Sequence, residues 1–228
     1  MFFDAGYTLL KTARPESEVF TEQVFASCGI AINVKDVNAN IGAMYQLYER
    51  LYEQDESFWS DDQRAVAIWK EMYMHLCSLL KLPKSAHTRI ASAVFRYYLN
   101  PKSWAFFADV LPVLQKLKLR GYKLGIISNW DCSLTSIING LNAASYFDSI
   151  IASADVRLHK PMPEIFALAC ERMNVCPYEA MHVGDHPTAD VAGAHAAGLM
   201  PVFVNRSGKD KICDVLNISD FSQLLAVL

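Results

Sequence analysis

Four short segments of the chain carry polar residues whose types suit the transfer of a charged group. Each segment lies where a short apolar run ends in a loop. They contain Asp4, Ser128 with Asn129, Lys160, and Asp185 with Asp190. A carboxylate, a hydroxyl, an ammonium and an acidic pair could together attack, bind and neutralise such a group. None of the four segments indicates this chemistry alone, so the elements that place them must decide whether they share a site.

The four segments follow apolar runs that predict strands of a parallel sheet. The runs are rich in Ile, Val and Phe and cover 1–4, 122–127, 148–152, 180–184 and 201–204. Stretches of helical length lie between them, at 109–120, 131–140 (opening at Asp131), 163–174 and 188–197. For the last of these we expect Thr188 as the N-cap and Gly198 just beyond the end. Ligands of open parallel sheets bind outside the carboxyl ends of the strands, so Asp4, Ser128 and Asp185 are expected in one site.

Residues 15–103 show helical periodicity and no strand pattern. Helices are predicted at 16–28, 35–54, 60–81 and 84–98, and their apolar and aromatic residues recur at the spacing of a bundle core. We therefore expect two parts: an α/β core of residues 1–14 and 104–228, and a four-helix insert of residues 15–103. Only three residues precede Asp4, so either the sheet tolerates a short first strand or the natural start lies upstream.

Composition excludes several classes of protein. The chain has 228 residues and a formal net charge of −3, without a basic tract, so nucleic acid is not an expected partner. No apolar run approaches the ~18–20 residues of a membrane helix, and no signal-peptide pattern is present. The six cysteines form no CxxC pair, which predicts buried reduced thiols and a cytoplasmic location rather than a metal cluster.

The order and spacing of the motifs resemble those of the haloacid dehalogenase superfamily of hydrolases. Its signature runs hhhDxDxT, then hhhS/T, then Lys, then GDxxxxD. Here these motifs stand as Phe3-Asp4-Ala5-Gly6-Tyr7-Thr8, Ile126-Ile127-Ser128-Asn129, Lys160-Pro161 and Gly184-Asp185-His186-Pro187-Thr188-Ala189-Asp190. The likeness is greatest to the subgroup called haloacid dehalogenase-like hydrolase domain-containing proteins. It implies a Rossmann-like parallel-sheet core with an all-helical (C1) cap inserted between the first two motifs.

The resemblance implies catalytic and metal-binding roles for the acidic residues. Asp4 would attack phosphorus in a small phosphorylated metabolite and form an aspartyl-phosphate. Asp4, Asp185 and the backbone carbonyl of Gly6 would hold Mg²⁺, a hard ion suited to oxygen ligands. Asp190 would orient that ligand shell.

The remaining motif residues would bind the phosphoryl group. Ser128 and Asn129 would contact it together with backbone N–H groups at the start of the 131–140 helix. Lys160 would neutralise charge on the nucleophile and the phosphoryl group. Thr8 would hydrogen-bond within the site and position the first loop.

Two further features of the sequence bear on the site. Of the histidines, His182 and His195 are expected to be structural, whereas His186 is a candidate because it directly follows Asp185. Met162 stands where relatives have an Asp before Pro163, and the loss of such a helix cap costs about 1 kcal/mol.

The chain departs from the pattern at Gly6, where the superfamily's phosphatases carry a second Asp. That Asp protonates the leaving alcohol and then activates the water that hydrolyses the aspartyl-phosphate. General acid–base help of this type is worth ~10²–10⁴ in rate, so ordinary phosphate esters are expected to be poor substrates.

Three explanations of Gly6 follow. The protein is a slow Mg²⁺-dependent phosphatase or phosphotransferase for which His186, Tyr7 or the substrate supplies the proton. Alternatively, it is a 2-haloacid dehalogenase, because a halide needs no proton. Those relatives, however, have an SSN-type fourth motif and use no metal, so the retained Gly184-Asp185 favours Mg²⁺. In the third explanation, the protein is a non-catalytic binding or regulatory protein. We favour the first explanation, and we expect the cap to close over the site and to determine substrate specificity. Within the cap, Trp59 and Arg64 are no better candidates for substrate contacts than their neighbours.

Overall fold

A six-stranded parallel sheet forms the centre of the larger part of the molecule. The computed structural model describes residues 1–206, 208 and 212–228. The strand order is β5-β4-β1-β6-β7-β8, and every neighbouring pair is parallel. The strands are β1 (Phe2–Phe3), β4 (Gly125–Ser128), β5 (Ser149–Ala152), β6 (Met181–Gly184), β7 (Met200–Val204) and β8 (Leu216–Ile218). This is the parallel α/β sheet that the alternating pattern predicted and the Rossmann-like fold that the family resemblance implied, with β1 in the middle of the sheet.

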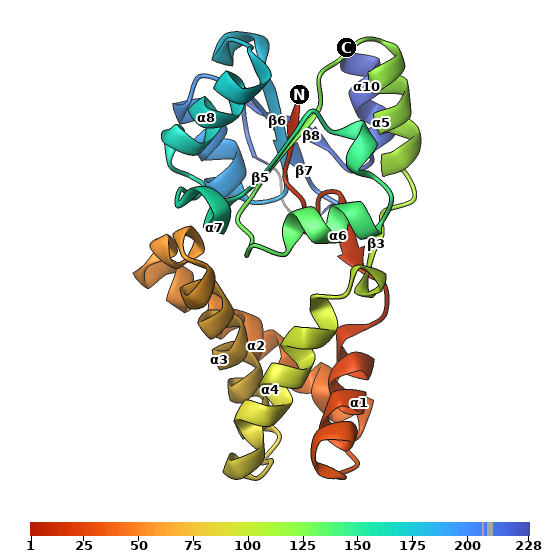
Figure 1. Cartoon of the computed structure of the whole chain (residues 1–228), viewed down its shortest axis with the longest axis vertical. Helices are drawn as coiled ribbons and strands as arrows, with labels where there is room; N and C mark the ends of the chain where they lie inside the picture. The colour runs from red at the N-terminus through yellow and green to blue at the C-terminus, as the bar shows by residue number, and fades with distance from the viewer. Residues whose placement is uncertain (207, 209–211) are drawn as a thin grey trace.

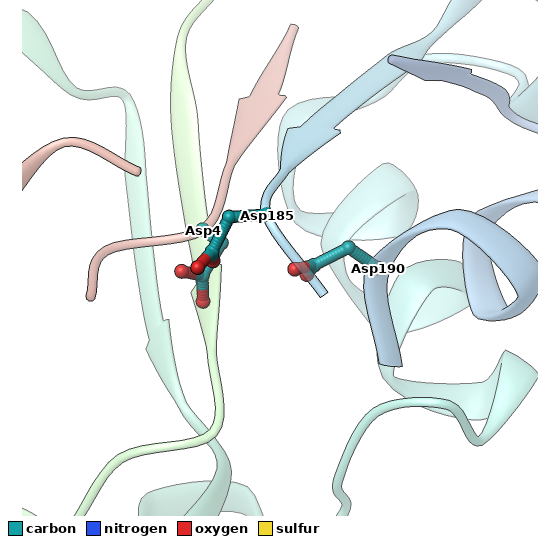
Figure 2. A group of neighbouring side chains, drawn as sticks. All are labelled: Asp4, Asp185 and Asp190. Atoms are coloured by element: carbon teal, nitrogen blue, oxygen red, sulfur yellow. The ribbon is translucent and has the colours of Figure 1, made fainter. Parts of the chain in front are cut away.

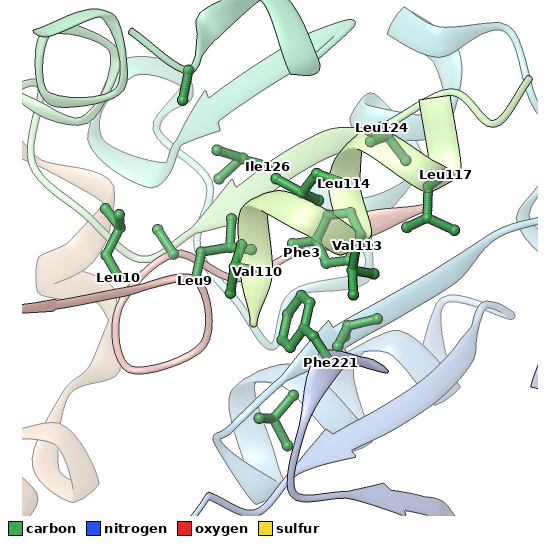
Figure 3. Packing of buried hydrophobic residues seen from close by; sticks show 14 of the residues in the cluster. Phe3, Leu9, Leu10, Val110, Val113, Leu114, Leu117, Leu124, Ile126 and Phe221 are labelled. Atoms are coloured by element: carbon green, nitrogen blue, oxygen red, sulfur yellow. The ribbon is translucent and has the colours of Figure 1, made fainter. Parts of the chain in front are cut away.

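Helices cover both faces of this sheet (Figure 1). They are α5 (Val110–Leu119), α6 (Leu134–Gly140), α7 (Ser153–Val156), α8 (Pro163–Met173), α9 (Gly193–Ala196) and α10 (Leu224–Val227). Consecutive residues of a strand point to opposite faces. Phe2 therefore packs in one cluster with side chains of α8, while Phe3 packs in another with α5 and with Phe221 (Figure 3).

Four longer helices form a second body below the sheet in Figure 1. They are α1 (Glu16–Cys28), α2 (Val34–Gln54), α3 (Asp62–Leu79) and α4 (Lys84–Tyr98), with a 3₁₀ turn η1 (Glu56–Ser60) before α3. They enclose a hydrophobic cluster of their own, which includes the fully buried Phe20, Met44, Met72 and Leu76. The boundaries at 14/15 and 103/104 between a core and a cap stay predictions.

A second, two-stranded sheet lies where the chain passes between the two bodies. Strand β2 (Leu10–Thr12) pairs antiparallel with β3 (Trp104–Phe106). The 3₁₀ turn η2 (Pro101–Ser103) leads from α4 into β3. The sequence did not predict this pairing, because each strand has only three residues and the two are joined through the whole helical insert. The ladder brings the entry and exit of the insert side by side.

Two predicted helix starts were wrong. The helix after β4 begins at Leu134 rather than at Asp131, because the Asp131 carboxylate accepts a hydrogen bond from the Ser133 N–H and holds a turn there. The stretch after β6 is a π-helical segment, Pro187–Ala192, followed by α9. Its N-cap is His186 and not Thr188, since the His186 ring accepts from the backbone of Thr188 and Ala189.

Some smaller elements and features complete the picture. Further 3₁₀ turns lie at η3 (Ala144–Tyr146), η4 (Pro177–Glu179) and η6 (Phe221–Gln223). Met162 precedes α8 without a side-chain cap, as expected. All six cysteines are free, but Cys132, Cys176 and Cys213 are exposed, so the expectation of buried thiols holds for only part of the set. In the described parts of the chain, no helix has the length and apolarity required to cross a membrane.

Candidate active site

Asp4 lies at the carboxyl end of the central strand β1 and is held there by both neighbouring strands. Its backbone N–H donates to the carbonyl of Val183 on β6 at 2.9 Å. Its Oδ1 accepts a hydrogen bond from Ser128 Oγ at 2.8 Å, and Ser128 ends β4. The same oxygen accepts from Lys160 Nζ at 2.7 Å. A carboxylate with one oxygen held in this way leaves the other available to a ligand or to a reacting atom.

Lys160 reaches this carboxylate from a loop that Asn129 fixes. The Asn129 side chain donates to the Lys160 carbonyl at 2.9 Å and accepts from the Lys160 N–H at 2.8 Å. The Lys160–Pro161 peptide is cis. The ammonium group also donates to Asp190 Oδ1, and the whole residue is 1% exposed. Lys160 therefore lies buried between two carboxylates, which is the arrangement that makes a buried ammonium tolerable.

Asp190 is fixed by three donors around the end of β6. Besides Lys160, its Oδ1 accepts from His182 Nε2 at 2.8 Å, and its Oδ2 accepts from the His186 N–H at 2.9 Å. Gly184 allows this approach: a Cβ at that position would lie 2.2 Å from Asp190 Cγ. His182 therefore has the structural contact expected of it, while His195 is exposed on α9.

Asp185 completes a group of three carboxylates at the sheet edge (Figure 2). Carboxylate oxygens of Asp4, Asp185 and Asp190 lie within 4.8 Å of one another, and Asp185 accepts from Thr8 Oγ1 at 3.1 Å. Three carboxylates against one lysine leave an excess of negative charge in a buried place. Oxygen donors with such an excess suit a hard divalent cation, so the residues present fit Mg²⁺.

The pKa values of the group reflect the same imbalance. Burial, followed by repulsion from Asp4 and Asp190, raises the pKa of Asp185 to about 8. Burial also raises the pKa of Asp4, although Lys160 opposes it. For Asp190, burial is outweighed by Lys160 and His182, which hold its pKa well below the usual range. Burial alone would lower the pKa of Lys160, but Asp190 and Asp4 raise it, so its ammonium form is retained.

The space beside Gly6, where the superfamily's phosphatases carry an acid, is bounded by an indole ring. A Cβ at Gly6 would lie 3.3 Å from Cζ3 of Trp130. Trp130 is itself fixed, since its Nε1 donates to Ser133 Oγ at 3.2 Å and its ring packs on Trp104 with centroids 4.8 Å apart. Tyr7, next in the chain, has a positive φ of 54° and hydrogen-bonds to Tyr45 of α2.

One predicted contribution to the site does not match the contacts, and a second, that of His186, stays a prediction. The N–H groups of Cys132 and Ser133 were expected to face a phosphoryl group, but they donate to Asp62 at 2.9 Å and to Asp131 at 2.8 Å. They are therefore occupied, the first of them by a residue of α3. His186 uses Nδ1 to cap the segment after it, and its ring packs on Tyr52 with centroids 5.4 Å apart.

Sequence reasoning missed the residues of the cap that face the site. Trp59 is buried in a small aromatic cluster and Arg64 pairs with Asp55 on the surface, so neither lines the pocket between the cap and Gly6. That pocket is instead lined by aromatic side chains around Glu16, the first residue of α1. The one signal in the sequence was an acidic residue at the start of the first cap helix, which also suits an ordinary helix N-terminus.

Comparison with known proteins places this geometry in a family. The family described as haloacid dehalogenase-like hydrolase matches residues 1–198. Haloacid dehalogenase-like hydrolase domain-containing protein 3 of Mus musculus is 29% identical, over 86% of this chain and 78% of its own length. Glyceraldehyde 3-phosphate phosphatase of Methanopyrus kandleri is 32% identical, over 51% of each chain, so this match spans about half of that relative.

Solved structures of a dehalogenase and of a phosphatase both resemble the whole chain. The 2-haloacid dehalogenase of Pseudomonas syringae pv. Tomato DC3000 is 27% identical, with a TM-score of 0.65 and coverage of 99% of this chain and 96% of its own. The HAD phosphatase of Thermococcus onnurineus is 26% identical, with a TM-score of 0.64 and coverage of 99% and 95%. The fold, the order of the motifs and the matched residues agree, and the chain belongs to the haloacid dehalogenase-like hydrolases.

Proposed function

We propose that this hydrolase is a Mg²⁺-dependent phosphatase that acts on a small phosphate monoester through Asp4. The observation that carries the proposal is the third carboxylate beside Asp4. Asp185 adds a half-buried carboxyl oxygen within 4.8 Å of oxygens of Asp4 and Asp190, and removal of a halide would make no use of it. A substrate with a phosphoryl group and a divalent cation would explain the excess of charge.

In the proposed reaction, an oxygen of Asp4 attacks phosphorus while the bond from phosphorus to the ester oxygen breaks. The leaving oxygen takes a proton from water or from the substrate, because Gly6 offers none. Water then attacks the phosphorus of the aspartyl-phosphate, loses a proton to solvent, and releases phosphate and the Asp4 carboxylate. Without a general acid both steps are slow, and esters with good leaving groups are favoured.

The other residues would hold and neutralise these groups. Lys160 and Ser128, both bonded to Asp4 Oδ1, orient the carboxylate and face the incoming phosphoryl oxygens. Asp4, Asp185 and the Gly6 carbonyl would hold Mg²⁺, with Asp190 and Thr8 as supports; the bound ion would offset charge between nucleophile and phosphate. Asn129 would act mainly through the Lys160 backbone that it fixes, in addition to the phosphate contact predicted for it.

A second candidate function is dehalogenation of a 2-haloacid. The observation in its favour is Gly6, because a halide leaves without a proton and needs no acid at that position. The whole-chain likeness to a 2-haloacid dehalogenase at 27% identity adds to it. Here Asp4 would attack the carbon that bears the halogen.

One set of assays separates these functions. Purified protein is given p-nitrophenyl phosphate, an acyl phosphate and 2-chloropropionate, with Mg²⁺ and with EDTA, and Asp4→Asn is the matched control. Phosphate release that EDTA and Asp4→Asn both abolish supports the phosphatase. Chloride release that persists in EDTA would replace it with a dehalogenase. A folded protein that is silent on every substrate would favour a binding or regulatory protein.

A further inference from the structure

An aromatic pocket lies between the Gly6–Tyr7 turn and the cap helices. Its cavity volume is about 40 Å³, and the pocket is partly open to solvent. Eight of its lining side chains are aromatic, among them Tyr7 and Trp130 from the core and Trp69 and Tyr98 from the cap. Tyr7 also lines the cavity that contains Asp185. This pocket and the cavity lined by Asp185 therefore share the Tyr7 side chain.

The charged groups of this pocket have one sign. Glu16 and Asp131 are its acidic residues, and no Lys, Arg or His occurs among the described residues that line it. Aromatic faces attract cations through their quadrupole, and a desolvated carboxylate attracts them more strongly. An anionic or a purely aliphatic ligand would leave the carboxylates of Glu16 and Asp131 without a positively charged partner. A compact organic cation would interact favourably with both these carboxylates and the aromatic rings.

Glu16 is held in place by phenols from two cap helices. Its Oε2 accepts from Tyr45 at 2.6 Å and its Oε1 accepts from Tyr73 at 2.8 Å. Tyr45 in turn lies 3.1 Å from the hydroxyl of Tyr7. Each carboxylate oxygen can accept a further hydrogen bond. Among the described residues, the hydrogen-bond partners of the Glu16 carboxylate are these two phenols, and no Lys, Arg or His is paired with it. Burial raises the pKa of Glu16, as expected for a carboxyl group that lacks a positive partner.

Tyr98 supplies a second, independent indication that the pocket is a ligand site. It is the last residue of α4 and lines the pocket. Its hydroxyl is buried and has no hydrogen-bond partner among the described residues. A buried hydroxyl without a partner is costly, and a ligand N–H could donate to its free oxygen.

We propose that this pocket binds a protonated amine on the organic part of the substrate, with Glu16 as the residue that determines specificity and Tyr98 as a second acceptor. The inference rests on the phosphatase function proposed above and names its substrate class: phosphate monoesters of amino alcohols. Because no basic residue occurs among the described residues that line the pocket, a carboxylate next to the amine has no partner among them. A phosphorylated amino acid such as O-phosphoserine should therefore be a poorer substrate than the amine that lacks the carboxylate.

The test compares matched esters on the full chain with Mg²⁺. The substrates are O-phosphoethanolamine and longer ω-aminoalkyl phosphates, each paired with the n-alkyl phosphate of equal length. The readout is the ratio of kcat/KM for the amine to that for the alkyl ester. One charged hydrogen bond predicts a ratio of roughly 10 to 100 at the preferred length. Glu16→Gln should remove most of this ratio.

Two further variants separate recognition from stability. Glu18→Gln changes an acid of the same helix that pairs with Arg14 on the surface, so the ratio should stay as in the wild type. Tyr98→Phe removes only the unpartnered hydroxyl, so it should fold normally and lower the ratio about 2- to 10-fold. A purely structural role of Glu16 would lower thermal stability and leave the ratio unchanged.

Failure of this inference and failure of the phosphatase function give different results. If p-nitrophenyl phosphate is hydrolysed but the ratio is near one, or Glu16→Gln leaves it unchanged, the amine site is wrong and the phosphatase stands. If no phosphate ester is turned over, calorimetric titration of the Mg²⁺-containing protein with the same ester pairs decides the inference. Amine-selective binding that Glu16→Gln removes supports it, and equal or absent binding of the two esters overturns it.

Discussion

Replacing Gly6 with Asp is the most direct test of the proposed chemistry. The Asp would restore the acid that protonates the leaving oxygen, which is worth ~10²–10⁴ in rate when it is well placed. The backbone at Gly6 lies outside the left-handed region, so the substitution adds no strain there. The obstacle is Trp130, whose ring edge would lie 3.3 Å from the new Cβ.

The structure reduces the expected gain below the full value of a general acid. A contact of 3.3 Å requires Trp130 to move by a few tenths of an ångström, and its Nε1–Ser133 hydrogen bond and its packing on Trp104 resist that. The Asp carboxylate would therefore be held imperfectly, so we expect a gain of about 10- to 100-fold, at or below the lower end of the range for general acids. Gly6→Ala is the matched control, because it adds the same Cβ without the acid.

The assay measures kcat/KM for an alkyl phosphate and for p-nitrophenyl phosphate with Mg²⁺. An alkoxide must be protonated as it leaves, whereas p-nitrophenolate leaves as an anion. Gly6→Asp should thus raise turnover of the alkyl ester more than that of the aryl ester, and Gly6→Ala should raise neither. Equal gains on both esters, or a gain with Ala as large as with Asp, would refute the view that leaving-group protonation limits this enzyme.

Three further outcomes follow from the carboxylate group. Lys160→Met leaves Asp4 and Asp190 without their buried cation, so the free energy of unfolding in EDTA should fall by about 3–5 kcal/mol. Added Mg²⁺ should then raise the melting temperature of this variant by more than it raises that of the wild type. Equal Mg²⁺ effects in both proteins would contradict the assignment. Without metal, the pKa of Asp185 is about 8 in the folded protein and 3.8 in the unfolded chain. The free energy of unfolding should therefore fall as the pH rises between these two values. Denaturant titrations at several pH values should show a weaker pH dependence for Asp185→Asn than for the wild type. Asp4→Asn should reduce phosphatase activity to background while the protein stays folded by circular dichroism, and residual turnover above that level would exclude Asp4 as nucleophile.

The sequence predicted the central part of the site because strand ends in a parallel sheet meet at one edge. Asp4 and Asp185 each follow a strand, Ser128 ends one, and β1 lies between β4 and β6 in the sheet order. Register in such a sheet is fixed by buried side chains, so residues far apart in sequence converge without any local signal. Their roles in catalysis remain predictions that the variants above will test.

Other features depend on contacts that a single sequence does not display. The pairing of β2 with β3 joins two segments separated by the entire cap, and short strands carry little periodic pattern. The N-cap of the segment after β6 is a histidine, which lies outside the usual set of capping residues. The Cys132 N–H looked free in sequence because its partner, Asp62, belongs to another helix.

The absence of an acid at position 6 and the aromatic pocket are consequences of one local arrangement. The ring that limits space beside Gly6 is Trp130, and the same ring forms part of the wall that faces Glu16. An Asp at position 6 would place a second carboxylate near that wall and would require the indole to move. An Asp side chain at position 6 and the present position of the Trp130 ring in the pocket therefore exclude each other, because they compete for the same volume. On this reasoning, Gly6→Asp should gain rate on simple alkyl esters and lose selectivity for amines, so the two properties should change in opposite directions in one variant.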